Sequence, residues 1–141
     1  MAVKVLVVED DTFLMKAYLT KLQNSGFDVQ SATDGEEAIV AMASFMPDIV
    51  LLDLVMPRKD GFEVLEWLKQ DGSLVHIPVV MITSSKVKAD VERAHDLGAR
   101  AYLLKPVALQ ELERLFTATE EFLCARASLF NHEPLNSLRI F

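Results

Sequence analysis

The sequence contains a single cysteine, Cys124, among 141 residues. One cysteine excludes an internal disulfide and a cysteine-lined metal cage, and it fits a reducing compartment. Long apolar runs are also missing, because Pro47, Asp48 and His76 interrupt the most hydrophobic stretches. No stretch predicts a membrane span, and the first apolar run is too short for a signal peptide because it already ends at Glu9. We therefore expect a soluble, cytoplasmic protein.

A surplus of basic residues is absent as well. The chain has 14 Lys and Arg against 21 Asp and Glu, a net charge of −7. This balance argues against direct binding to nucleic acid, which needs a basic face, and against docking on an anionic membrane. Hydrophobic residues make up 51% and charged residues 25%, as in ordinary globular proteins. The length suits one domain with a substantial core.

Five short apolar runs predict β-strands. Residues 3–8, 49–52 and 79–82 are apolar at nearly every position, which is typical of strands buried on both faces of a parallel sheet. Residues 29–32 alternate between apolar and polar, as an edge strand does. Residues 101–104 form the fifth run.

Helical periodicity separates these runs. Asp34 and Glu37 have the spacing of a capping box, and Gly98 marks a helix end. Strands and helices therefore alternate five times, which predicts right-handed crossovers and a doubly wound α/β sheet with helices on both faces. The apolar stripes contain Phe13, Leu14, Ala17, Tyr18 and Leu22; Ala38, Ile39 and Met42; Phe62, Leu65 and Leu68; Val87, Val91, Ala94 and Leu97; and Leu109, Leu112, Leu115, Phe116, Phe122 and Leu123.

The chain divides into one domain over residues 1–125 and a C-terminal tail over residues 126–141. The tail is rich in large apolar side chains and poor in charge, unlike a flexible linker. We expect it to dock, either on its own domain or on a second copy, because leaving these side chains in water is unfavourable. Its large apolar residues are Leu129, Phe130, Leu135, Leu138, Ile140 and Phe141.

Polar residues follow the predicted strands, at the edge where open α/β sheets bind ligands. Glu9 and Asp10 end the first run, Asp53 the third, Thr83 the fourth and Lys105 the fifth. Three clustered carboxylates repel one another and stay ionised only beside a cation. Their hard oxygen atoms suit Mg²⁺, which shares its coordination shell with phosphoryl groups. The sequence therefore predicts a magnesium site at this edge.

The same residues predict phosphoryl chemistry. Asp53 is the best candidate for a nucleophile that forms an acyl phosphate, while Lys105 supplies positive charge and Thr83 a hydrogen-bond donor. Each residue alone also has an ordinary explanation. The acidic triplet 9–11 could be a turn with a helix cap, Asp53 a loop residue and Thr83 part of a capping cluster. Their coincidence at one edge favours a functional site.

These residues stand in motifs that resemble the receiver domain of bacterial response regulators, over about residues 3–125. The separations of 30 residues from Asp53 to Thr83 and 52 from Asp53 to Lys105 fit that family. The matching motifs are Val7-Val8-Glu9-Asp10, Leu51-Leu52-Asp53-Leu54, Met56-Pro57, Asp60-Gly61, Ile82-Thr83-Ser84, Gly98-Ala99 and Lys105-Pro106.

The resemblance implies a flavodoxin-like sheet of five parallel strands in the order 2-1-3-4-5. It implies that Asp53 accepts a phosphoryl group from a histidine kinase or phosphotransfer protein. Glu9, Asp10 and Asp53 would hold Mg²⁺ together with the backbone carbonyl of Val55. The protein would then be a signalling switch that catalyses only its own phosphorylation and dephosphorylation.

The resemblance also implies how the switch would work. Lys105 would bind the phosphoryl group, Thr83 would move toward it, and Tyr102 would follow inward. The surface that changes would bind a downstream protein that the sequence does not identify. A second copy of the chain, forming a homodimer, is a further candidate partner.

Two other function classes share parts of this pattern. A haloacid-dehalogenase-like phosphohydrolase also forms an aspartyl phosphate, but it usually carries a second acid two residues after the nucleophile, where this chain has Val55. A flavin-binding electron carrier of similar topology would need a phosphate-binding loop after the first strand. Here that position holds Glu9, Asp10 and Asp11, which would repel a phosphate.

Overall fold

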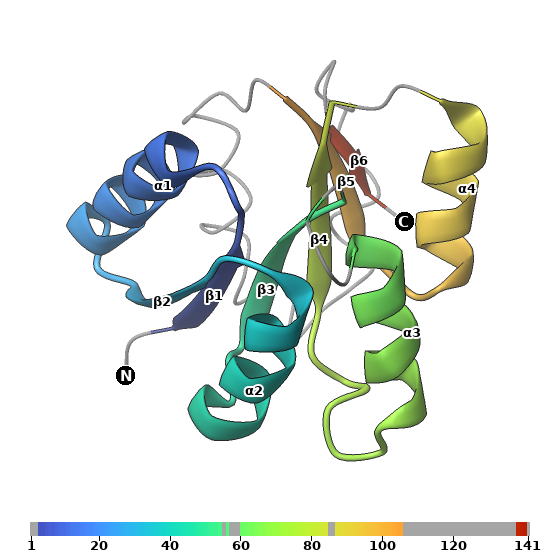
Figure 1. The fold of residues 1–141 in the computed structure, drawn as a ribbon, viewed down its shortest axis with the longest axis horizontal. Helices are drawn as coiled ribbons and strands as arrows, with labels where there is room; N and C mark the ends of the chain where they lie inside the picture. The colour runs from blue at the N-terminus through green and yellow to red at the C-terminus, as the bar shows by residue number, and fades with distance from the viewer. Residues whose placement is uncertain (1–2, 55, 57–59, 85–86, 106–137, 141) are drawn as a thin grey trace.

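The computed structural model describes residues 3–54, 56, 60–84, 87–105 and 138–140. Five parallel strands alternate with helices and lie in the order β2-β1-β3-β4-β5, as predicted (Figure 1). The strands are β1 (Lys4–Val8), β2 (Asp28–Ala32), β3 (Ile49–Asp53), β4 (Val79–Thr83) and β5 (Ala101–Leu104). The helices are α1 (Thr12–Asn24), α2 (Gly35–Phe45), α3 (Gly61–Gln70) and α4 (Lys88–Asp96).

A sixth strand that the sequence did not predict extends the sheet. Strand β6 (Leu138–Ile140) pairs with β5 in antiparallel orientation. The helix expected over residues 109–123 lies outside the described residues, as does the tail from 126 to 137. Docking of the tail as a whole stays a prediction.

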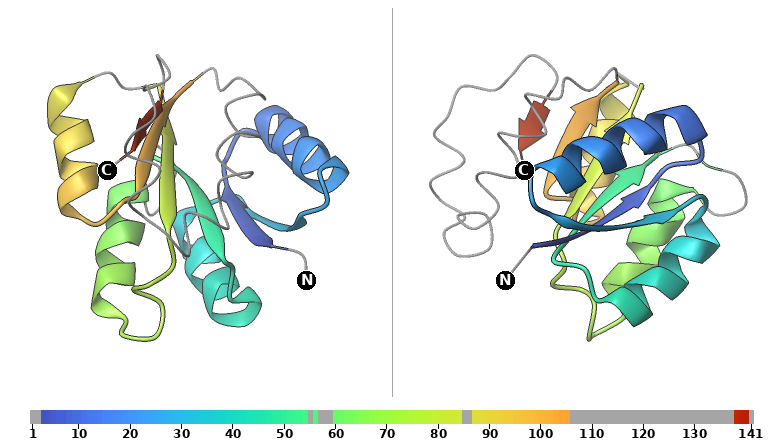
Figure 2. Two further views of the ribbon diagram at one scale, coloured as in Figure 1. Left: turned by 180° about the vertical axis from the view of Figure 1, so that it is seen from behind. Right: turned by 90° about the vertical axis from the view of Figure 1, so that its left-hand side faces the viewer.

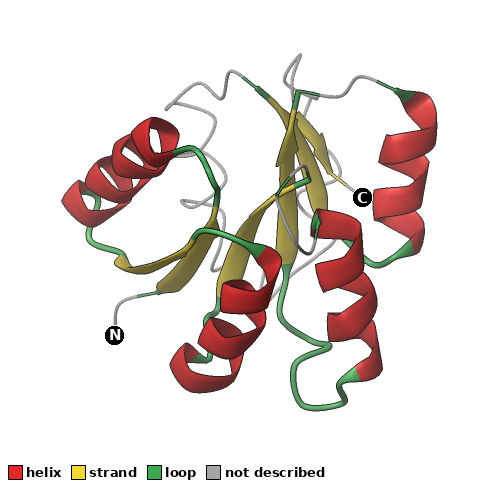
Figure 3. Cartoon of the chain, viewed as in Figure 1, coloured by secondary structure: helices red, strands yellow, loops and turns green. Residues whose placement is uncertain are grey.

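Helices cover both faces of the sheet (Figures 1 and 2). Helix α1 packs on one face, and α2, α3 and α4 pack on the other. Figure 3 shows the strands enclosed between these two layers. Every residue of β3 and β4 is buried, which explains why their sequences are apolar throughout. Strand β2 exposes most of its residues, as expected at an edge.

Aspartate residues define where three of the helices begin. The side chain of Asp11 accepts hydrogen bonds from the first backbone N–H groups of α1, and Asp34 and Asp60 do the same for α2 and α3. These caps satisfy N–H groups that have no partner within the helix. Asp11 is therefore the helix cap that one interpretation of the acidic triplet predicted.

In the described part of the chain, no helix combines the length and apolar character needed to cross a bilayer.

Candidate functional site

The carboxyl ends of four strands deliver the predicted site residues to one edge of the sheet. Glu9 and Asp10 directly follow β1, and Asp53 is the last residue of β3. Thr83 is the last residue of β4, and Lys105 directly follows β5. The parallel topology makes this convergence unavoidable, because all these strands end at the same edge.

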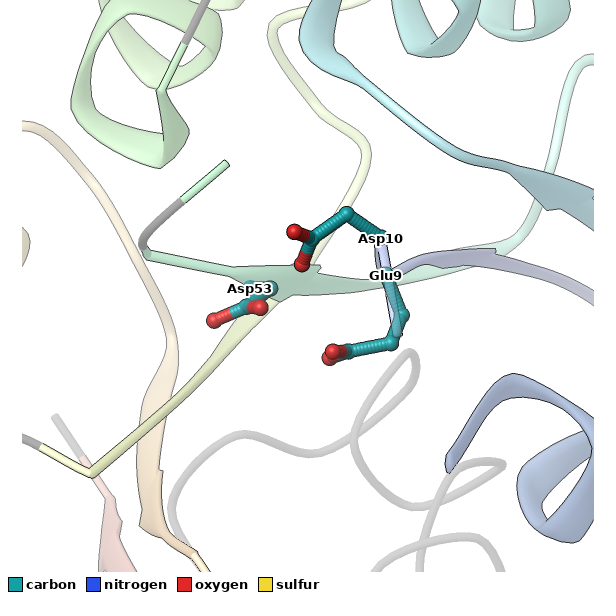
Figure 4. Close-up of side chains that lie close together, drawn as sticks. All are labelled: Glu9, Asp10 and Asp53. Carbon is teal, nitrogen blue, oxygen red and sulfur yellow. The ribbon is translucent and has the colours of Figure 1, made fainter. Parts of the chain in front are cut away.

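Glu9, Asp10 and Asp53 form a compact carboxylate cluster. One oxygen atom from each of the three carboxylates lies within 4.8 Å of the other two. Figure 4 shows the three side chains gathered beyond the ends of β1 and β3. Glu9 and Asp53 are buried, whereas Asp10 is exposed and leaves the cluster open to solvent on its side. Such a set of oxygen atoms fits a divalent cation that retains some of its water ligands.

Lys105 joins two of these carboxylates. Its Nζ atom lies 3.1 Å from Asp53 Oδ2 and 3.1 Å from Glu9 Oε2. The Lys105 side chain is 21% exposed, so these ion pairs are only partly screened by water. The structure thus brings the ammonium group from β5 across β4 to the end of β3.

Backbone hydrogen bonds fix the strand ends from which these side chains project. The N–H of Glu9 donates to the carbonyl of Ala32, at 3.0 Å, which extends the β1–β2 pairing by one residue. The N–H of Lys105 donates to the carbonyl of Thr83, at 2.8 Å. The site is therefore built on the rigid sheet, which holds its geometry better than loops would.

Burial and neighbouring charges shift the pKa values of Glu9 and Lys105. Burial raises the pKa of Glu9 to about 7, and the neighbouring Asp53 carboxylate adds to this effect, while Lys105 opposes it. Burial alone would lower the pKa of Lys105, but the charges of Asp53 and Glu9 outweigh it and the pKa is raised. Lys105 is therefore charged at neutral pH, and Glu9 lies in an environment where an added cation would stabilise its charge.

Thr83 and Tyr102, the predicted switch residues, are both buried, with exposed fractions of 1% each. Thr83 pairs with Leu104 in the β4–β5 register, and Asp53 pairs with Ile82 in the β3–β4 register. Thr83 is thus placed one residue further along the sheet than Asp53. Val55, the predicted backbone ligand, lies outside the described residues.

Sequence reasoning did not single out Tyr18 beyond the apolar stripe of its helix. Tyr18 is buried on α1, in the apolar cluster between that helix and the sheet. Burial raises the pKa of its hydroxyl to about 12, and the charge of Glu9 contributes to the increase. The hydroxyl therefore keeps its proton near the acidic cluster. No sequence signal distinguishes such a residue from its purely apolar neighbours.

Comparison with known proteins decides the family. The family model of the response regulator receiver domain matches residues 5–117. The chain belongs to the response-regulator receiver family. It is 36% identical, over 105 residues, to the polar-differentiation response regulator DivK of Brucella anthropi, covering 74% of this chain and 85% of that protein.

Solved structures agree with this receiver assignment. The chemotaxis protein CheY4 of Vibrio cholerae superposes with a TM-score of 0.80 at 25% identity, covering 84% of this chain and 99% of CheY4. The phosphorylated cyanobacterial phytochrome response regulator RcpA superposes with a TM-score of 0.74 at 32% identity, covering 90% of this chain and 97% of RcpA. The protein is a receiver domain of two-component phosphorelay signalling, and the phosphohydrolase alternative finds no support.

Proposed function

We propose that this receiver accepts a phosphoryl group on Asp53 from the phosphohistidine of a histidine kinase or phosphotransfer protein. The observation that carries the proposal is the double contact of Lys105 with Asp53 and Glu9, beside a three-carboxylate cluster. A structural ion pair would need one carboxylate. The additional acids add repulsion that only a bound cation or a phosphoryl reaction makes useful.

In the proposed transfer, an oxygen atom of the Asp53 carboxylate attacks the phosphorus atom of phosphohistidine. A P–O bond forms and the P–N bond to the imidazole breaks, and its electron pair returns to the ring nitrogen. The product on Asp53 is an acyl phosphate. Lys105, already 3.1 Å from Asp53 Oδ2, needs only a small movement to contact the new phosphoryl oxygens.

Mg²⁺ fits the acidic cluster, and we assign its protein ligands to Glu9, Asp10 and Asp53, with the Val55 carbonyl as a fourth. The carboxylates already lie close together, and hard oxygen donors are the ligands that this ion prefers. When bound, the ion neutralises charge that develops on the phosphoryl oxygens. The chain's own contribution is to hold Asp53 at the end of a buried strand and keep Lys105 charged beside it.

We assign the switch to Thr83 and Tyr102. A hydroxyl donor at the end of β4 is suited to hydrogen-bond a phosphoryl oxygen on the adjacent strand. Tyr102 is already buried in the core cluster beneath α3 and α4. Its role would be to transmit a movement of Thr83 to the helices that pack on that side of the sheet.

The protein would act through contacts with other proteins and not as an enzyme on a separate substrate. Its partners would be the phosphoryl donor and an unidentified downstream protein, in the cytoplasm, and a second copy of the chain is a further candidate. The acidic net charge of −7 disfavours nucleic acid and anionic membranes as direct partners.

Replacement of the acceptor tests the proposal. Asp53→Asn should abolish labelling by acetyl phosphate or phosphoramidate in the presence of Mg²⁺, because an amide oxygen is a poor nucleophile. Asp28→Asn, an exposed site on β2, is the matched control and should label like the unmodified protein. Intact-mass spectrometry measures the labelling. Full labelling of the Asp53→Asn variant at the usual rate would refute the assignment.

A further inference from the structure

Strand β6 occupies the edge of the sheet beside β5. Its register pairs Ile140 with Ala101, Arg139 with Tyr102 and Leu138 with Leu103. Without β6, strand β5 would be the outer strand of the described sheet, with a row of backbone groups available to another strand.

The two edges of the parallel sheet differ in character. Strand β2 carries polar residues and exposes most of them. Strand β5 has the sequence Ala-Tyr-Leu-Leu, with no charge, and its first three residues are buried. Charged residues normally discourage strand addition at an edge. The β5 edge lacks them, so it is suited to accept an extended segment, and residues 138–140 are the segment seated there.

Strand β5 also leads directly into the acidic site. Lys105 follows its last residue, donates a backbone hydrogen bond to Thr83 and contacts Asp53 and Glu9 through Nζ. Lys105 directly follows β5, and β6 pairs with β5. A movement of this short strand would therefore affect both the Lys105 side chain and the pairing of β6.

We propose that residues 138–140 cover the β5 edge while Asp53 is unmodified, and that phosphorylation of Asp53 weakens this pairing and exposes the edge. The proposal rests on the function proposed above. β6 is seated while Lys105 contacts both carboxylates. A phosphoryl group on Asp53 would compete for Lys105 Nζ and pull on the end of β5. Because coupling is reciprocal, seated β6 would also disfavour the phosphorylated arrangement.

Amide hydrogen exchange on the full chain tests the first half of this coupling. The probe is beryllofluoride, which in the presence of Mg²⁺ mimics a phosphoryl group on an aspartate. The Asp53→Asn chain is the negative control. Protection of residues 101–103 and 138–140 should fall by about fivefold, the lower end of typical coupling between sites. Exchange in β2, the opposite edge, should not change.

A deletion tests the reverse direction. A chain lacking residues 138–141 should bind beryllofluoride about fivefold more tightly than the full chain, whereas a chain lacking only Phe141 should not differ from it. Circular dichroism verifies folding, and the exchange measurement needs no deletion. Unchanged protection in the full chain, or equal affinities in all three chains, would overturn the coupling and leave the acceptor assignment intact. If beryllofluoride fails to bind the full chain, the proposed function and this inference both fall.

Discussion

Glu9 is a carboxylate in a place where burial and the Asp53 carboxylate both disfavour its charge. Its pKa is raised from 4.5 to about 7, so the folded protein binds this proton more tightly than the unfolded chain does. The stabilisation that this proton provides is complete below pH 4.5 and is lost as the pH rises through about 7. An ionised Glu9 therefore destabilises the folded state at neutral pH in the absence of metal.

Glu9→Gln should remove this loss, because the amide resembles the protonated acid. In EDTA, we expect the variant to gain stability over the unmodified protein between about pH 4.5 and 7, reaching on the order of 3 kcal/mol above that range. Urea unfolding at a series of pH values measures the difference. Parallel stability curves for the two proteins would contradict the raised pKa.

Asp10, unlike Glu9, is exposed, and the only role that we propose for it is to bind the metal ion. Loss of even an outer-shell partner costs ~10–100-fold in metal affinity, so Asp10→Asn should weaken Mg²⁺ binding by at least about tenfold. Labelling of Asp53 should slow but persist, since the nucleophile remains. Isothermal titration with Mg²⁺ gives the affinity.

Asp11→Asn is the matched control for this change. It removes the same charge one residue away, and asparagine caps a helix as well as aspartate does. Equal losses of Mg²⁺ affinity in both variants would show that general charge, and not ligation by Asp10, accounts for binding.

Gly61 fixes how closely helix α3 approaches the acceptor strand. A Cβ atom at this position would lie 2.6 Å from the carbonyl oxygen of Asp53 and 2.9 Å from the Cα of Leu54. These are backbone atoms, so the strand end or the helix must move. Gly61→Ala should therefore destabilise the fold by about 1–3 kcal/mol and slow the labelling of Asp53.

Gly72→Ala is the control, because nothing lies within 4 Å of the added methyl group. Its stability should stay within about 0.5 kcal/mol of the unmodified protein. Thermal unfolding and acetyl phosphate labelling of the two variants provide both comparisons. A stable Gly61→Ala protein that labels normally would show that α3 does not restrain the acceptor.

At the level of strands and helices, the sequence predicted what depends on local patterns. Strands β1, β3 and β4 followed from nearly continuous apolar runs, and the edge strand β2 followed from alternation of apolar and polar residues. The beginning of α2 followed from Asp34 and Glu37. The site residues were found because parallel strands end at one edge. Their roles remain proposals that the tests above address.

Strand β6 could not be predicted in the same way. It is three residues long, and its partner strand lies more than thirty residues earlier in the chain. Leu138, Arg139 and Ile140 alternate between apolar and polar, but three residues are too few to predict a strand, and their pairing depends on an edge that only the folded sheet provides. Tyr18 was missed for a similar reason, since Glu9, Asp53 and Lys105, which act on its hydroxyl, come from the ends of three strands that are distant in sequence.

In the molecule as a whole, the residues that stabilise the fold lie apart from the residues that form the site. The two apolar clusters on either side of the sheet hold the strands in register, while acids and a lysine that would destabilise a core collect at one edge. Under the proposed coupling, a phosphoryl group at that edge would act on the sheet through β5 without unfolding either cluster. This arrangement is what a switch acting through protein contacts requires.

Chemical mapping of the phosphorylated residue tests whether Asp53 carries the phosphate. The protein is phosphorylated with phosphoramidate and Mg²⁺ and then treated with borohydride, which reduces an aspartyl phosphate to homoserine. Mass spectrometry of the peptides locates the reduced residue. We predict homoserine at position 53 and at no other aspartate. Reduction at Asp10 or elsewhere, with Asp53 unchanged, would show that Asp53 is not the acceptor.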